Sequence, residues 1–186
     1  MKKYIVWSFL TLLFIGCGAS SNYFVLATPS TIKTYQTNAL PTIGVDKISL
    51  PEYLQQNKIA IQLSPTQISY KKDVWAGDME TLLTKDLIAT IQKSFNNPYV
   101  YAYPWNLSKQ AGMRVKVSIS RFIAYKDTIY LDANWEIYNI KTQQSRSKLF
   151  SITVPSKEDT ASIVSSMSRA FAKLSLEITA EIAHKF

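Results

Sequence analysis

Residues 113–138 read MRVKVSISRFIAYKDTIYLDANWEIY, and this stretch decides the fold. Its first part alternates apolar with polar side chains: Met113, Val115, Val117 and Ile119 against Arg114, Lys116, Ser118 and Ser120. The same alternation returns from Ile129 to Ile137, after the polar turn Lys126-Asp127-Thr128. An alternation of period two is typical of a strand that buries one face, so the stretch predicts a hairpin with one face on a core and the other in water.

More strands lie on both sides of this hairpin. The chain turns again over residues 141–145 and returns through 148–154, which predicts a three-stranded meander. Short apolar runs bounded by turn residues predict further strands at 22–27, 43–50, 58–64, 67–71 and 99–105, with a turn or single helical turn at 52–57. Residues 28–42 are rich in Thr, Ser, Pro, Gln and Asn without periodicity, so we expect a loop or tether there.

Two amphipathic helices complete the predicted domain. The first spans 78–95, with Asp78 as its N-cap, a stop at 96–98 and an apolar stripe of Met79, Leu83, Leu87, Ile91 and Phe95. The second spans about 157–184, with Ser156 and Asp159 as an approximate capping box and a stripe of Ile163, Met167, Phe171, Leu174, Ile178 and Ile182. We therefore expect a single α+β domain, with a mostly antiparallel sheet and the two helices packed on one face.

The N-terminus has the order of a secretory leader. Lys2 and Lys3 precede a nearly unbroken apolar run over residues 4–15, which is shorter than a spanning helix needs. The run ends at Gly16 and Cys17, and Cys17 is the one cysteine of the chain. Residues 13–17 (LFIGC) resemble the lipobox of bacterial lipoprotein signal peptides.

This resemblance implies how the chain is processed. The thiol of Cys17 would receive a diacylglycerol, and the leader would be cut just before it. The expected organisation is then a signal peptide at 1–16, a lipidated tether at 17–21 and the domain at 22–186. Two or three acyl chains on Cys17 would hold the protein stably on a membrane, facing the periplasm. The absence of Asp at Gly18 favours the outer membrane over the inner one.

The remaining composition argues against catalysis and nucleic-acid binding. The net charge is +8, but the basic residues are scattered and form no dense stripe, so the basic surface fits anionic lipid headgroups better than nucleic acid. The one histidine, His184, lies near the end of the second helix, so no serine or cysteine nucleophile has a plausible base. Zinc clusters and glycine-rich phosphate loops are also missing, so we expect no metal, no cofactor and no enzyme activity.

Apolar residues in predicted loops are candidates for a partner-binding patch. These are Pro51, Tyr53 and Leu54 after the second strand, and Trp75 in the expected loop before the first helix. Trp75 fits equally well as a core residue that closes the end of the sheet.

The order of motifs resembles the ABC-type transport auxiliary lipoproteins, the PqiC/YmbA-like group. A lipobox is followed by a Tyr-x-x-Leu strand at 23–26, Pro-x-Tyr-Leu at 51–54 and a Trp-Ala step at 75–76. The meander then supplies Val115, Val117, Phe122, Leu131, Ala133 and Trp135, and a long amphipathic helix closes the chain.

The resemblance implies a binding function that composition alone does not indicate. Members accompany transport systems with MCE-domain proteins, which move lipids between the inner and outer membranes. The chain would dock a periplasmic conduit to its membrane, with an MCE-domain protein as partner and with assembly as a homo-oligomer also open. Two alternatives remain at this stage: a freestanding lipoprotein that scaffolds or activates a cell-envelope enzyme, and a hydrolase that uses carboxylates alone.

Overall fold

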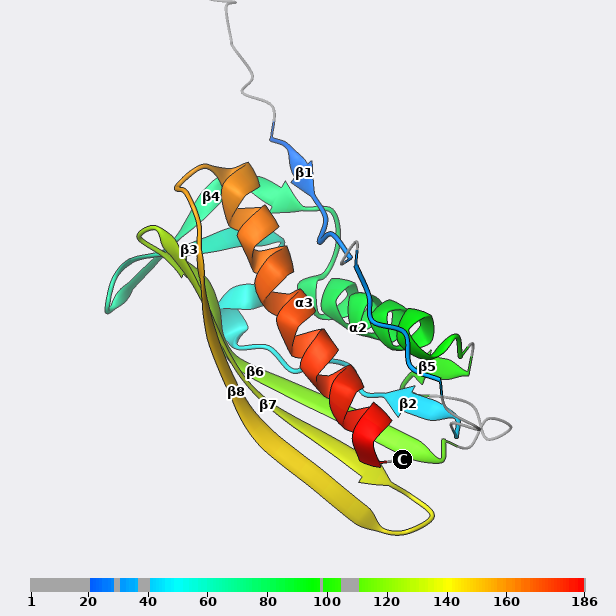
Figure 1. Cartoon of the computed structure of the whole chain (residues 1–186). Coiled ribbons are helices and arrows are strands. Elements are labelled where there is room, and N and C mark those ends of the chain that lie inside the picture. The colour runs from blue at the N-terminus through cyan, green and yellow to red at the C-terminus, as the bar shows by residue number, and fades with distance from the viewer. Residues whose placement is uncertain (1–20, 29–30, 37–40, 98, 105–110, 186) are drawn as a thin grey trace, which may run out of the picture.

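The computed structural model describes residues 21–28, 31–36, 41–97, 99–104 and 111–185. The predicted leader and Cys17 lie outside these residues. The described part forms two layers, a sheet and the two helices, and both helices lie on the same face of the sheet (Figure 1). None of the described helices is long and apolar enough to span a bilayer.

The predicted meander is confirmed. Strands β6 (Met113–Tyr125), β7 (Thr128–Asn139) and β8 (Gln144–Pro155) pair antiparallel in chain order. β6 extends beyond the predicted strand. Its register shifts between Ile119 and Arg121, and after this shift even-numbered positions, such as Phe122, are buried. The alternation in the sequence therefore ends at Ser120 although the strand continues.

The other strands add parallel pairings, so the expected mostly antiparallel sheet is only partly right. β2 (Ile43–Val45) lies parallel between β6 and β5 (Val100–Ala102), and β3 (Lys58–Ser64) lies parallel to the far end of β6. β4 (Gln67–Trp75) pairs antiparallel with β3, and β1 (Tyr23–Phe24) pairs parallel with β4. Within the described residues the result is a mixed sheet of eight strands.

The segment after β2 follows the edge of β6 without forming a regular strand. Asp46 N–H donates to Val115 O at 2.9 Å, and Ser49 N–H donates to Val117 O at 3.1 Å. The short 3₁₀ helix η2 (Glu52–Leu54) then turns the chain into β3. The predicted strand at 43–50 is thus a three-residue strand with an irregular continuation along the same edge.

Both helices start at an aspartate. Helix α2 (Met79–Phe95) has the predicted N-cap, because Asp78 Oδ2 accepts the Thr81 N–H at 3.0 Å. Helix α3 (Thr160–Lys185) starts later than predicted, because Asp159 Oδ1 accepts the Ser162 N–H at 2.8 Å. Asp159 is therefore the cap itself, and the capping box with Ser156 is wrong.

The core lies between the meander and the two helices. The predicted stripes of α2 and α3 are all buried. Trp135 on β7 is fully buried beneath α3, and its indole N–H donates to Glu177 Oε1 at 3.1 Å. This bond satisfies the polar atom that so large a buried ring carries and ties β7 to α3.

Candidate interaction surfaces

Two of the four predicted contact residues belong to the core. Trp75 is the last residue of β4 and not part of a loop, and only 2% of it is exposed. Leu54 is likewise 2% exposed, while Pro51 and Tyr53 are half-buried. Leu54 and Trp75 are therefore not exposed contacts, and for Trp75 this agrees with the core alternative that the sequence left open. β4 extends beyond the predicted strand, and its last residue, Trp75, lies beside β1, where it pairs with Phe24.

Tyr53 has a structural role at the irregularity of β6. Its hydroxyl oxygen accepts the Phe122 N–H at 3.1 Å, just after the register shift. Burial raises the pKa of Tyr53, so the hydroxyl stays protonated. The side chain therefore supplies a partner that a bulged strand would otherwise lack.

The N-terminal segment is docked on the domain, and so is Tyr35, which lies within the loop or tether expected at 28–42. Asn22 donates from its backbone N–H and its side chain to Asp73 Oδ1, at 3.0 and 3.1 Å. Ala27 N–H donates to Ser168 Oγ at 3.1 Å. Further along, Tyr35 N–H donates to Ser94 O at 2.7 Å, and the Tyr35 ring stacks on Phe95. The fold therefore begins at about Asn22, because the N-terminal segment brings apolar side chains to the core.

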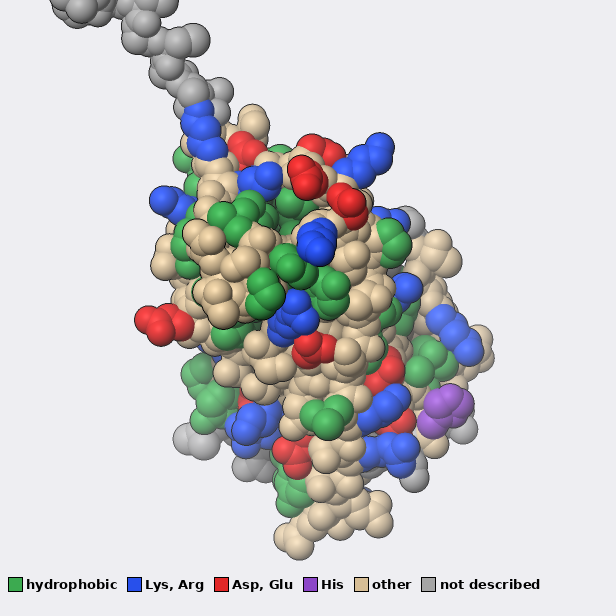
Figure 2. Space-filling model, turned by 90° about the vertical axis from the view of Figure 1, so that its left-hand side faces the viewer, with side chains coloured by type: hydrophobic (Ala, Val, Ile, Leu, Met, Phe, Trp, Pro, Cys, Tyr) green, Lys and Arg blue, Asp and Glu red, His purple; other side chains and the backbone are tan. Residues whose placement is uncertain are grey.

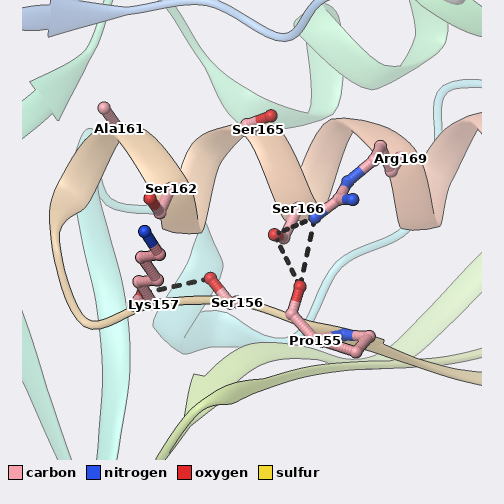
Figure 3. Close-up of a pocket in the computed structure, with 8 residues that line it drawn as sticks. All are labelled: Pro155, Ser156, Lys157, Ala161, Ser162, Ser165, Ser166 and Arg169. Atoms are coloured by element: carbon pink, nitrogen blue, oxygen red, sulfur yellow. Dashed lines mark hydrogen bonds between the residues drawn. The ribbon is translucent and has the colours of Figure 1, made fainter.

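A groove along the outer side of α3 is a candidate binding site. Two hollows, of about 500 and 460 Å³, meet at Ser165 and Arg169. Figure 3 shows the first hollow, between the loop that follows β8 and the first turns of α3. Arg169 Nη2 donates to Pro155 O at 3.1 Å and to Ser166 Oγ at 2.7 Å. The guanidinium is thus held across the groove.

The lining of the groove is basic and rich in hydroxyl groups. Its cations are Lys157, Arg169 and Lys173, and none of the described residues that line the two hollows is a carboxylate. The other lining residues are short: Ala27, Thr28, Thr31, Pro155, Ser156, Ala161, Ser162, Ser165, Ser166, Ser168 and Ala172. The short side chains allow the backbone of another chain to approach closely, and the three cations favour an acidic chain.

A third, smaller hollow lies on the face of the sheet that carries no helix. It measures about 210 Å³ and is lined by Arg114, Lys116, Glu136 and Tyr138. Arg114 forms a two-pronged ion pair with the nearly buried Asp46, with N–O distances of 2.8 to 3.1 Å. The pair fixes β2 against β6, so its charges serve the fold.

The described residues form no cluster suited to metal binding or to acid–base catalysis by paired carboxyls. No group of three or more His, Cys, Asp and Glu side chains lies close enough together there to hold a metal ion. Asp86 on α2 is a largely buried carboxyl, and burial raises its pKa. The groups that act on Asp86 are Thr28 and Lys93, and neither is a second carboxyl.

Comparison with known proteins identifies the family of this chain. The family model described as the ABC-type transport auxiliary lipoprotein component matches residues 24–179, from β1 into α3. The chain belongs to this family. Membership in the ABC-type transport auxiliary lipoproteins associates the chain with transport and with anchoring in a bacterial envelope. No curated protein is significantly similar to it in sequence.

Solved structures confirm the fold of this family member. An uncharacterized protein superposes with a TM-score of 0.70 at 17% identity, covering 88% of this chain and 99% of the other. A Xanthomonas campestris protein of family DUF330 gives a TM-score of 0.66 at 15% identity, covering 85% and 92%. At these identities the likeness shows the fold alone.

Sequence reasoning missed the groove along α3. The outward positions of this helix carry small residues and cations, such as Ala161, Ser165 and Arg169, where long polar side chains are usual. That signal is visible in the sequence. What borders these positions depends on the fold of the loop after β8 and on Ala27, Thr28 and Thr31, which are distant from α3 in the chain.

Proposed function

We propose that this auxiliary lipoprotein serves an ABC-type system that moves lipids between the two membranes of the envelope, with an MCE-domain protein as its partner. In this function the chain docks a periplasmic conduit to the membrane that anchors it, and it acts by contact without catalysis. The observation that carries the proposal is the family match over residues 24–179, which spans both layers of the fold.

The anchor in this proposal is Cys17, on the outer membrane. Four residues, and therefore five residue-to-residue steps, lie between Cys17 and Asn22, where the described contacts of the domain begin. A chain of that length reaches at most about 18 Å. The anchored domain would therefore stay close to its membrane. This short reach supports a docking subunit over the alternative of an enzyme activator on a long tether.

The partner would bind in the groove along α3. Lys157, Arg169 and Lys173 attract an acidic segment, and the short side chains between them let its backbone approach. Arg169 is the central cation because it lines both hollows. Pro51 and Tyr53 remain candidates for secondary contacts at the end of the sheet.

Co-purification with the MCE-domain protein of the same organism tests this function. The mature lipoprotein and the MCE-domain protein would be co-expressed and isolated through a tag on the lipoprotein. We expect the wild type to retain its partner, and Arg169→Glu to lower retention about tenfold by reversing one charge in the groove. Lys85→Glu, the same change at an exposed position of α2, is the matched control and should retain the partner.

The outcomes separate the function from its site. No association of the wild type, together with normal membrane integrity in a deletion strain, would overturn the transport function. Retention by Arg169→Glu equal to the wild type would leave the function standing and remove the groove as the docking site.

A further inference from the structure

Strand β8 leaves a long edge of the sheet open. It pairs with β7 along its whole length, and no described residue pairs with its other side. The β7–β8 register contains no bulge, and the sole proline of β8 is its last residue, Pro155. Natural proteins usually protect such an edge with bulges, prolines or charges, because its unpaired N–H and C=O groups attract another strand.

The register shows which backbone groups face outward. Thr128 lies opposite Pro155, and one step further along the same register Ser156 N–H donates to Asp127 O at 2.9 Å. Hydrogen-bonded pairs alternate along an antiparallel ladder. The even-numbered residues of β8 therefore bond to β7, and the odd-numbered ones direct their N–H and C=O groups to the open edge. These are Ser145, Ser147, Leu149, Ser151 and Thr153.

None of these five residues carries a protective charge. Their side chains point away from the helices, and Leu149 at their centre is 81% exposed. The two cations of β8 point the other way: Arg146 is ion-paired with Glu181 and Lys148 with Glu177 on α3. Figure 2, which looks at this side of the molecule, shows charges of both signs dispersed among apolar side chains.

The edge is complementary to itself. If two copies meet antiparallel with Leu149 opposite Leu149, then Ser147 faces Ser151 and Ser145 faces Thr153 of the other copy. All five outward residues then find outward partners, which is the condition for a regular ladder. Between them, Lys148 lies opposite Phe150 and Arg146 opposite Ile152, so no like charges oppose each other.

We propose that two copies of this chain join along β8, with a two-fold axis at Leu149, so that their sheets become one continuous sheet. The second copy covers the most exposed leucine of the described residues and satisfies the open backbone groups. The proposal goes beyond the transport function and needs neither the anchor nor the MCE-domain partner. The alternative is that a strand of a different protein pairs with this edge of β8.

Cysteine cross-linking of the mature lipoprotein in detergent tests the register. Opposite residues of a hydrogen-bonded pair have Cα atoms about 5.5 Å apart, within the range of a disulfide. Leu149→Cys should therefore form a covalent homodimer under mild oxidation. Ser147→Cys and Ser151→Cys should not do so singly, since each would lie about 13 Å from its own copy. An equal mixture of these two variants should cross-link.

A charge at the axis tests the interface independently. Leu149→Lys places two like charges opposite each other and should weaken dimerisation about tenfold or more in analytical ultracentrifugation. Leu63→Lys, at another exposed leucine, should leave it unchanged. The proposal is overturned if Leu149→Cys cross-links no better than Ser147→Cys, if it cross-links to a different protein, or if Leu149→Lys dimerises like the wild type.

Discussion

Gly112 shows how a single residue sets the approach of two strands. A Cβ atom on Gly112 would lie 2.5 Å from Cβ of Pro41, and a proline ring has little freedom to move aside. The Gly112 N–H donates to Thr42 O at 2.8 Å, next to the start of β2. Any shift that makes room for a side chain would disturb the β2–β6 pairing, so this position requires glycine for close approach.

We therefore expect Gly112→Ala to lower the free energy of unfolding by about 1–3 kcal/mol. Urea denaturation followed by circular dichroism measures this change. Gly77→Ala is the control, because its Cβ would meet Leu82 at an ordinary distance of 3.7 Å. Equal stability of the two variants would show that Pro41 gives way.

The start of α3 is decided at the scale of the element. Asp159 accepts the Ser162 N–H, whereas the Ser156 hydroxyl donates to the neighbouring Lys157 O. Hydrogen bonds from the Ser162 side chain and then from its backbone hold the pKa of Asp159 below the ordinary 3.8. A carboxyl with a lowered folded pKa stabilises the fold above its unfolded pKa, and this contribution is lost as the pH falls through the folded value.

Asp159→Ala should thus lower Tm by about 2–4 °C at pH 7, and Ser156→Ala should not. Thermal unfolding of both variants checks this. The difference between Asp159→Ala and the wild type should shrink as the pH is lowered below 3.8. A larger effect of Ser156→Ala would restore the capping box that the sequence suggested.

The direction of the strands is a second property of the elements. The meander could be predicted because its partners are neighbours in the chain and are joined by short turns. The parallel pairings of β2 and β3 with β6 could not, because a period of two in the sequence is the same for either direction.

At the scale of the whole molecule, anchoring and folding should be separable. The domain is tied down from Asn22 onward, so the acyl chains expected on Cys17 are not part of its core. We expect Cys17→Ala to lose its acyl mass and its membrane fraction while keeping the wild-type circular dichroism spectrum. Cell fractionation and intact-mass measurement test this. Retention in the membrane without lipid would contradict the anchor.

The sequence by itself determined the meander, the two amphipathic helices, the Asp78 cap and, through its motif order, the family. The helices and the cap depend on residues a few positions apart, and the meander on alternating strands joined by short turns, so periodicity and turn residues record them directly. Only the tertiary structure decided the mixed sheet, the burial of Trp75 and Leu54, and the groove beside Arg169. Each of these depends on which distant segments meet, and the free energy of those long-range contacts leaves no local pattern in the chain.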